Sequence, residues 1–187
     1  IRIAFHAAGI AFEDNRLSFA EFGEMRGTTR FNAVPVLEID GAAVTQSNAI
    51  GRYVGKLAGL YPKDDLQALY CDEVVGALED IYHHVVPTFG LQGEELKSAR
   101  EKLADGWLTI FSRGLDELLS RGGGDYFADR RLTIADLKMF VQTRWLVSGG
   151  LEHVPADLVH NLAPSLIEHE KRVSGESIVA AYYASRS

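Results

Sequence analysis

Two neighbouring stretches carry the side chains best suited to binding an anionic ligand. In "TQSNAIGRY", Gln46 and Ser47 stand directly before apolar positions at helical spacing. The start of a helix leaves backbone N–H groups unpaired, and the helix dipole favours an anion there. Gln46 adds an amide donor and acceptor and Ser47 a hydroxyl, so a ligand carboxylate fits this point. The alternative is that Ser47 only caps its own helix.

The second stretch is "VPVLEIDG", where Pro35 stands at the head of an apolar run. A trans proline at the start of a strand is the ordinary case. A cis bond would instead turn the backbone of Val34 outward, where its N–H and C=O can pair with an extended peptide ligand. Both interpretations are open from the residues alone. A peptide-like ligand with a carboxylate at one end would use this edge and the helix start together.

The elements that position these residues are a hairpin and a helix. Asp40-Gly41 separates "VPVLEI" from "AAVTQ", which predicts a two-residue hairpin turn. In "SNAIGRYVGKLAG" the apolar residues recur at helical spacing and the pattern ends at Gly59. Further upstream, "IRIAFHAAG" predicts a helix, "IAFEDNRLS" a strand, and "FAEFGEMRG" a short helix or a loop.

Beyond the connector "LYPKDD" the sequence predicts helices only. Apolar periodicity marks one long helix over residues 66–85 and a second over 99–118 that closes at "RGGGDY". A third begins at "LTIADLKMF", where Thr133 and Asp136 form a relative of the capping box, and another lies around "APSLIEHEKRV". We therefore expect a small α/β domain in residues 1–58 and an all-helical domain in residues 63–187.

Composition and charge disfavour several classes of partner and site. The chain of 187 residues is 47% apolar and 24% charged, which is typical of a globular protein, and its net charge of −7 disfavours nucleic acid and anionic membrane as partners. We find neither a transmembrane run nor a signal peptide pattern, and the single cysteine, Cys71, fits a reducing compartment, so we expect a cytoplasmic protein. The cysteine and histidine spacings match no metal motif, and no metal is expected.

The combination of "FNAVPVLEIDG", "TQSNAIGRY", the Pro-containing connector and "LTIADL" resembles the cytosolic glutathione transferases, most closely the sigma class and its Tyr-type relatives. The resemblance covers essentially the whole chain. It implies a thioredoxin-like N-terminal domain, an all-α C-terminal domain, a homodimer and a cis bond before Pro35. It also implies glutathione as co-substrate, with its thiolate attacking a small hydrophobic electrophile.

The resemblance further implies roles for individual residues around glutathione. Val34, next to Pro35, would pair its backbone with the cysteinyl part, while Gln46 and Ser47 would hold the γ-glutamyl end. Asp80, in "GALEDIY", would reach across the dimer to the γ-glutamyl amine of the neighbouring site. The alternative for Asp80 is a place on an acidic solvated face together with Asp72, Glu73 and Glu79.

Two positions depart from the family pattern, which has a Trp and, four residues on, a Lys that reaches the glycyl carboxylate. Phe22 and Arg26 stand at these positions. Arg26 keeps the cation and can bind a carboxylate bidentately, although it could also be a plain surface charge. Phe22 keeps the ring but lacks the indole N–H, so one hydrogen bond is in doubt.

The catalytic group that the resemblance implies is a Tyr at the end of the first strand, ahead of the first helix. We expect this strand and its Tyr upstream of Ile1, so no residue of the sequence is assigned as the catalyst. The Tyr hydroxyl would stabilise the glutathione thiolate by a hydrogen bond. The electrophile would lie between the domains; the candidate residues of this acceptor site are Tyr82, His83, Val86 and Phe89.

Alternatives to these assignments remain. His83 and His84 could suggest acid–base chemistry but are more typical of a helix surface. On the same scaffold, the protein could be a glutathione-dependent isomerase or peroxidase. It could also be a non-catalytic structural or interaction module, because a fold alone does not establish an activity.

Overall fold

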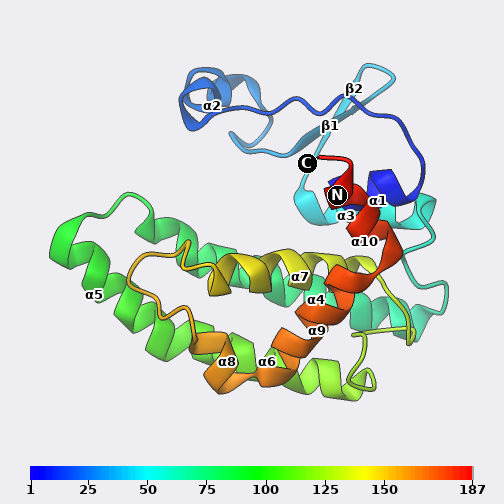
Figure 1. Ribbon diagram of the computed structural model, residues 1–187. Coiled ribbons are helices and arrows are strands. Elements are labelled where there is room, and N and C mark those ends of the chain that lie inside the picture. The colour runs from blue at the N-terminus through cyan, green and yellow to red at the C-terminus, as the bar shows by residue number, and fades with distance from the viewer. Residues whose placement is uncertain (187) are drawn as a thin grey trace.

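The computed structural model describes residues 1–186, which form a small N-terminal part with one hairpin and a larger helical part (Figure 1). The N-terminal elements are α1 (Arg2–Ala7), α2 (Phe19–Met25), the 3-10 turn η1 (Arg26–Thr28), β1 (Val36–Ile39), β2 (Ala42–Thr45) and α3 (Ser47–Leu57). The helical part contains α4 (Asp65–Val85), the 3-10 turn η2 (Val86–Thr88), α5 (Gly93–Leu103), the π-helical turn η3 (Ala104–Leu108), α6 (Thr109–Arg121), α7 (Ile134–Val147), α8 (Leu158–Leu162), α9 (Pro164–Gly175) and α10 (Ser177–Ala184).

The hairpin turns at Asp40 and Gly41, as the sequence predicts. Both residues have positive φ angles, 50° and 78°, which a tight two-residue connection between antiparallel strands requires. In the resulting register, Val36 of β1 lies opposite Thr45 of β2.

The segment 10–18, predicted as a strand, forms no strand in the structure. A strand needs the N–H and C=O groups of a neighbour, and within residues 1–186 the sheet contains only β1 and β2. Side chains fix the segment instead, because Asp14 accepts hydrogen bonds from Arg2, Arg16 and Arg186. The prediction failed because alternating apolar residues indicate a strand without showing whether a partner is present.

The helical part is built around α4 and α7, which pack side by side. The buried residues of α4 recur at helical spacing; they are Cys71, Val74, Val75, Leu78, Ile81 and Val85. Leu66, which the sequence places on the same apolar face, is instead 52% exposed. The second predicted long helix begins earlier than expected, at Gly93, and continues through η3 into α6. Trp107 and Ile110, which the sequence places on its apolar face, remain 47% and 59% exposed.

Helix α7 starts at the predicted capping box. The backbone N–H and hydroxyl of Thr133 donate to Oδ2 of Asp136 over 2.8 and 2.6 Å. Oδ1 of Asp136 accepts from the backbone N–H of Phe127 and lies 2.9 Å from Nε2 of His169 in α9. Asp136 and His169 are completely buried, so one carboxylate joins the start of α7, the preceding loop and α9.

The contact between the two parts fixes the position of α3. Gly55 of α3 lies so close to Ile134 that a Cβ atom there would come within 2.4 Å of Ile134 Cγ2. Only a glycine fits this approach without a shift of one helix. Helix α3 therefore rests on the N-terminal end of α7.

Candidate functional site

Helix α3 begins one residue later than the proposed cap. Gln46 occupies the N-cap position with φ 76°, no side chain caps the helix, and Ser47 is its first helical residue. The alternative in which Ser47 only caps its own helix is therefore wrong: its hydroxyl donates to Glu79 Oε2 of α4 over 3.2 Å. Because no side chain caps the first turn, its N–H groups can receive an anion.

The hairpin register brings the two sequence stretches together. Since Val36 lies opposite Thr45, the next residues outward are Pro35 on one strand and Gln46 on the other. The Val34–Pro35 bond is cis, as the resemblance implied, and Val34 is 51% exposed. Val34 and the start of α3 thus lie at the same end of the hairpin.

Phe22 lies in α2 and Arg26 in η1. Figure 1 shows α2 at the end of the hairpin opposite the turn between β1 and β2. Phe22 is half-buried and Arg26 is exposed. The Arg26 Nε donates to the backbone oxygen of Asn32 over 3.0 Å. This bond holds the guanidinium on the loop that leads into Pro35.

A polar network beneath Ser47 was not predicted from the sequence. Lys138 Nζ of α7 donates to Glu79 Oε2 over 2.9 Å, to Asn48 Oδ1 over 2.7 Å and to the backbone oxygen of Val75 over 3.2 Å. Lys138 lies 59 positions from Glu79 in the sequence, so no local pattern indicates their contact. Lys138 therefore offsets the negative charge of the carboxylate closest to the Ser47 hydroxyl.

The pKa of Glu79 reflects this arrangement. Burial raises the pKa, but the hydrogen bond and the charge of Lys138, helped by the Ser47 hydroxyl, outweigh it and hold the pKa below its ordinary value. Glu79 is consequently an anion at neutral pH.

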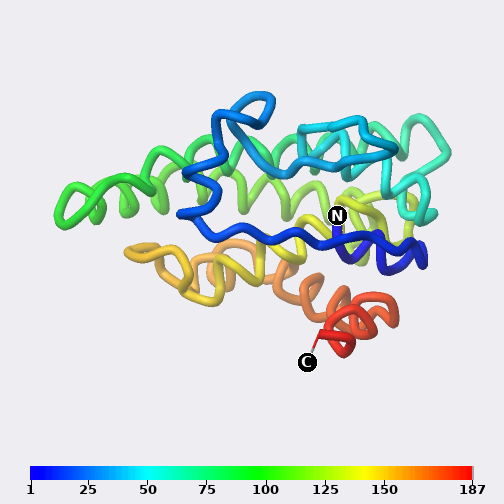
Figure 2. The backbone as a smooth tube through the Cα atoms, turned by 90° about the horizontal axis from the view of Figure 1, so that it is seen from above, coloured from blue at the N-terminus to red at the C-terminus, as the bar shows by residue number. Residues whose placement is uncertain are grey.

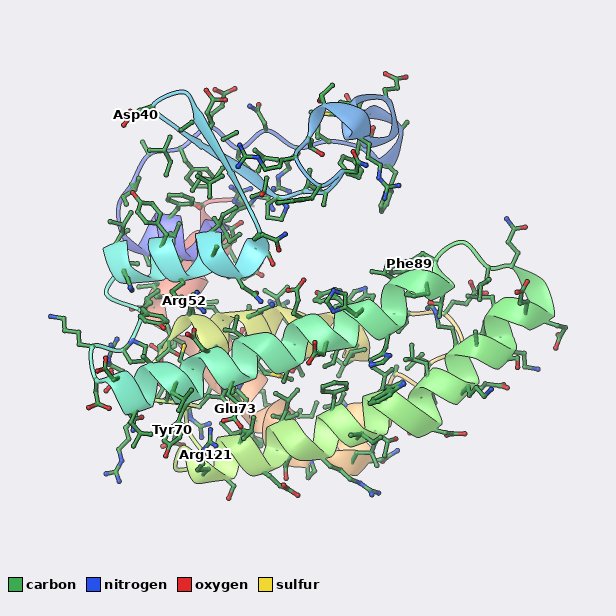
Figure 3. All side chains as sticks on the ribbon, turned by 180° about the vertical axis from the view of Figure 1, so that it is seen from behind. Asp40, Arg52, Tyr70, Glu73, Phe89 and Arg121 are labelled. Atoms are coloured by element: carbon green, nitrogen blue, oxygen red, sulfur yellow. The ribbon has the colours of Figure 1, made fainter. Side chains whose placement is uncertain are left out.

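Asp80 is on the exposed side of α4. Its side chain is 64% exposed, and Oδ1 lies 3.8 Å from His83 Nδ1. The other carboxylates of the predicted acidic face are not simply solvated: Asp72 pairs with Arg52, Glu73 with Arg121 and Glu79 with Lys138. Figure 3 shows Glu73, Tyr70 and Arg121 gathered between α4 and α6, where Arg121 lies over the Tyr70 ring at 4.0 Å.

The four candidate residues of the acceptor site differ in environment. Tyr82 is half-buried and stacks on Trp145 of α7, with ring centroids 6.2 Å apart; burial, then the charge of Glu79, raises its pKa. Val86 is 55% exposed and follows one turn later, while the His83 side chain is 74% exposed. Phe89 is 59% exposed, but its ring lies over Arg100 of α5.

The sequence reasoning missed Trp145, which stacks on Tyr82. Trp145 lies on α7, far from Tyr82 along the chain, so no local pattern indicates the contact. The interpretation of the two histidines as a surface pair holds for His83 alone. His84 stacks on Trp107 with ring centroids 4.0 Å apart.

Within 1–186, no group of three or more His, Cys, Asp or Glu side chains is arranged to hold a metal ion. None of the helices in this range is both long enough and apolar enough to cross a bilayer.

Comparison with known proteins gives matches along most of the chain. The family model for the glutathione S-transferase N-terminal domain matches residues 1–56, and that for the C-terminal domain matches residues 79–186. The chain is 30% identical to "Glutathione S-transferase 3" of Caenorhabditis elegans, over 91% of its own length and 85% of that protein. It is 30% identical to "Hematopoietic prostaglandin D synthase" of Gallus gallus, over 99% of its length and 88% of that protein.

A solved structure shares the fold over the whole chain. The structure of rat hPGDS complexed with a quinoline aligns with 100% of this chain and 89% of that one, with a TM-score of 0.83 and 27% identity.

Proposed function

The chain belongs to the glutathione S-transferase family, and from this premise we propose that it transfers the thiolate of glutathione to a small apolar electrophile. The observation that carries the proposal is the hairpin register, which places Val34 and Pro35 beside Gln46 and Ser47 at the open start of α3. One peptide-like ligand can contact both an extended backbone edge and an anion site at that end.

We assign the parts of glutathione as follows. The γ-glutamyl carboxylate lies at the start of α3, where it accepts from the first-turn N–H groups and from Ser47, with Gln46 beside it. The cysteinyl part pairs with the backbone of Val34. The Ser47 hydroxyl must then turn its proton from Glu79 to the ligand, which Lys138 makes easier by neutralising Glu79.

At the other end of the ligand, the glycyl carboxylate pairs with Arg26, and Phe22 lies against the same part of the molecule. Arg26 is exposed and its Nε is already held by the Asn32 carbonyl, which leaves its other donors to reach the carboxylate.

The hydroxyl that activates the thiol is assigned to none of Tyr53, Tyr70, Tyr82 and Tyr126. Tyr70 lies under Arg121, and Tyr82 is stacked on Trp145. Tyr126 donates to Glu176, and this bond, with burial, raises its pKa to about 12. In this bond Tyr126 uses its one hydroxyl proton. Tyr53 lies on α3 and is 46% exposed.

The acceptor site in this proposal consists of Tyr82, His83 and Val86. Phe89 is left out because its ring faces Arg100 and a separate cavity. A second candidate function is isomerisation, because one of the relatives at 30% identity is a prostaglandin D synthase. Assaying both thiol conjugation and prostaglandin D formation separates the two.

We propose a cytoplasmic homodimer in which Asp80 serves the neighbouring site. Exposed apolar side chains on α4, η3 and α6 support a dimer, since Leu69, Trp107 and Ile110 are 61%, 47% and 59% exposed. Analytical ultracentrifugation tests the assembly. If the wild-type protein sediments only as a monomer, the role of Asp80 is lost; if it is a dimer, Asp80→Asn should weaken glutathione binding.

The central test is Ser47→Ala, measured by isothermal titration calorimetry with glutathione. We expect affinity to fall by about 1 to 3 kcal/mol, the range for removing a hydrogen bond to a charged group. Ser148→Ala is the matched control, because Ser148 Oγ donates only to the nearby Trp145 carbonyl. Unchanged affinity in Ser47→Ala would remove the site assignment. If the full-length protein binds glutathione but catalyses neither conjugation nor isomerisation, a non-catalytic module is favoured.

A further inference from the structure

A cavity of about 450 Å³ lies at the end of the helical part where α4 gives way to α5. Its walls come from the η2 segment, the start of α5 and the loop that follows α7. Phe89, labelled in Figure 3, lies at this end of α4, far from Arg52 of α3. Figure 2 likewise shows the α4–α5 turn extending beyond the N-terminal segments. None of the residues assigned to glutathione lines the cavity, so the two sites are built from different residues.

Arg100 lines this cavity and is only 4% exposed. A buried guanidinium is normally paired with a carboxylate, because removing a charge from water is costly. Within residues 1–186, no Asp or Glu oxygen comes within 4.0 Å of the Arg100 guanidinium. The charge of Glu152 attracts it from farther away, and Oε1 of Glu152 lies 3.3 Å from His153 Nε2. Burial accordingly lowers the pKa of Arg100, and the attraction of Glu152 does not compensate.

The protein holds the Arg100 guanidinium with neutral groups. Nε donates to the Thr88 hydroxyl, which in turn donates to the Val85 carbonyl. Nη1 makes a long bond of 3.4 Å to the backbone oxygen of Glu152, and one face of the guanidinium lies 5.2 Å from the Phe89 ring centroid. Of the five guanidinium N–H donors, these bonds use two. The side chain is thus oriented, while its charge is not balanced.

Glu152 is the one carboxylate among the described lining residues, and its side chain is 73% exposed. Glu94 and Glu95, in the first turn of α5, are exposed and do not line the cavity. Among the lining residues Phe89, Leu91 and Leu96 supply apolar surface. The cavity thus combines one buried cation with an apolar wall, and its volume lies within the usual range for small-molecule sites.

We propose that this cavity binds a small organic carboxylate, with its carboxylate group on Arg100 and its apolar body against Phe89, Leu91 and Leu96. Two parallel N–H···O bonds from a guanidinium to a carboxylate match in geometry and are strengthened by charge. The ligand would supply the counter-charge that Arg100 lacks, and the ring or chain would cover the exposed side of Phe89.

Benzoate is a suitable probe, with benzyl alcohol as its neutral counterpart, and binding to the complete protein can be followed by calorimetry or ligand-observed NMR. We expect benzoate to bind and benzyl alcohol to bind at least about tenfold more weakly, since the charged hydrogen bonds are lost. Saturating glutathione should leave benzoate affinity unchanged. Equal binding of the two probes, or competition with glutathione, would overturn the proposal.

Variants locate the site. Arg100→Met should weaken benzoate binding about tenfold or more, whereas Arg113→Met, which removes an exposed cation of α6, should not. Glu152→Gln should tighten binding about two- to threefold, because it removes the opposing rim charge while leaving Arg100 in place. This last variant keeps the test decisive if Arg100→Met does not fold. Benzoate affinity that is unchanged in Glu152→Gln and Arg100→Met refutes the assignment.

Discussion

Lys138 offers the sharpest test of how the two parts of the chain cooperate. Its ammonium group, on α7, neutralises Glu79, whose carboxylate oxygen lies 3.2 Å from the Ser47 hydroxyl at the proposed glutathione site. In Lys138→Met, Glu79 keeps its negative charge and faces the γ-glutamyl carboxylate with only the hydroxyl between them. Glutathione affinity should therefore fall although Lys138 does not itself contact the ligand.

The magnitude follows from the separation of the two carboxylates. The Ser47 oxygen lies 3.2 Å from Glu79 Oε2, and one hydrogen bond from the hydroxyl to the ligand adds about 2.7 Å, so the two carboxylates lie ~6 Å apart. At that distance an effective dielectric of about 40 gives a repulsion of ~1.4 kcal/mol. The side chains of Lys138 and Glu79 are 23% and 36% exposed, so an effective dielectric between that of the interior and that of water is appropriate. We expect a loss of about 1 to 2 kcal/mol, or roughly five- to thirtyfold in Kd.

The assay is calorimetric titration of glutathione into four proteins: the wild type, Lys138→Met, Glu79→Gln and the double variant. Neutralising Glu79 should restore much of the affinity lost in Lys138→Met, so the two effects should not add. Lys138→Arg should bind nearly as well as the wild type, and added salt should reduce the effect of Lys138→Met.

Lys171→Met is the matched control, because Lys171 pairs with Glu168 on the exposed surface of α9. The reasoning is refuted if Lys138→Met binds glutathione as tightly as the wild type. It is equally refuted if the double variant binds no better than Lys138→Met, since the loss would then not be electrostatic.

Three further outcomes follow from the same contacts. Hydrogen bonds from Arg2, then Arg16 and Arg186, lower the pKa of Asp14 from 3.8 to about 2. The stability that these bonds contribute is present above the unfolded pKa and is lost as pH falls toward 2. Asp14→Asn should therefore flatten the acid side of a pH–stability curve, and an unchanged curve would contradict this. Burial raises the pKa of the Cys71 thiol to about 11, so a thiol reagent at pH 8 should label the protein only in denaturant, and rapid native labelling would disprove the placement. Asp136→Ala should lower the free energy of unfolding by about 3 to 5 kcal/mol, because four buried hydrogen bonds lose their acceptor. Urea denaturation measures this change, and a loss below about 1 kcal/mol would show that the network contributes little.

Local signals predicted the elements well where a short segment contains all the necessary information. The Asp40-Gly41 turn needs two residues with positive φ, and the Thr133–Asp136 capping box needs two side chains three positions apart, so each can be read from a few letters. The strand predicted over residues 10–18 failed because a strand is defined by its neighbour, which no local pattern supplies. The domain bounds of 1–58 and 63–187 remain a prediction.

The candidate site divides in the same way. Most of the residues that would contact glutathione come from "VPVLEIDG" and "TQSNAIGRY", with Phe22, Arg26 and Asp80 elsewhere, and the resemblance to the family made them recognisable in the sequence. What surrounds them did not follow from sequence: Lys138, Glu79 and Trp145 meet the site from helices that are distant along the chain.

The sequence by itself determined which backbone segments form a turn, a helix start and a capping box, because these depend on the conformational preferences of adjacent residues. Only the tertiary structure decided where the charges lie relative to one another. It placed Lys138 under Ser47 and left Arg100 buried beside a cavity without a carboxylate partner among the described residues. The physical reason is that electrostatic energy depends on distance through space and on exposure to water, and neither quantity is local in the sequence.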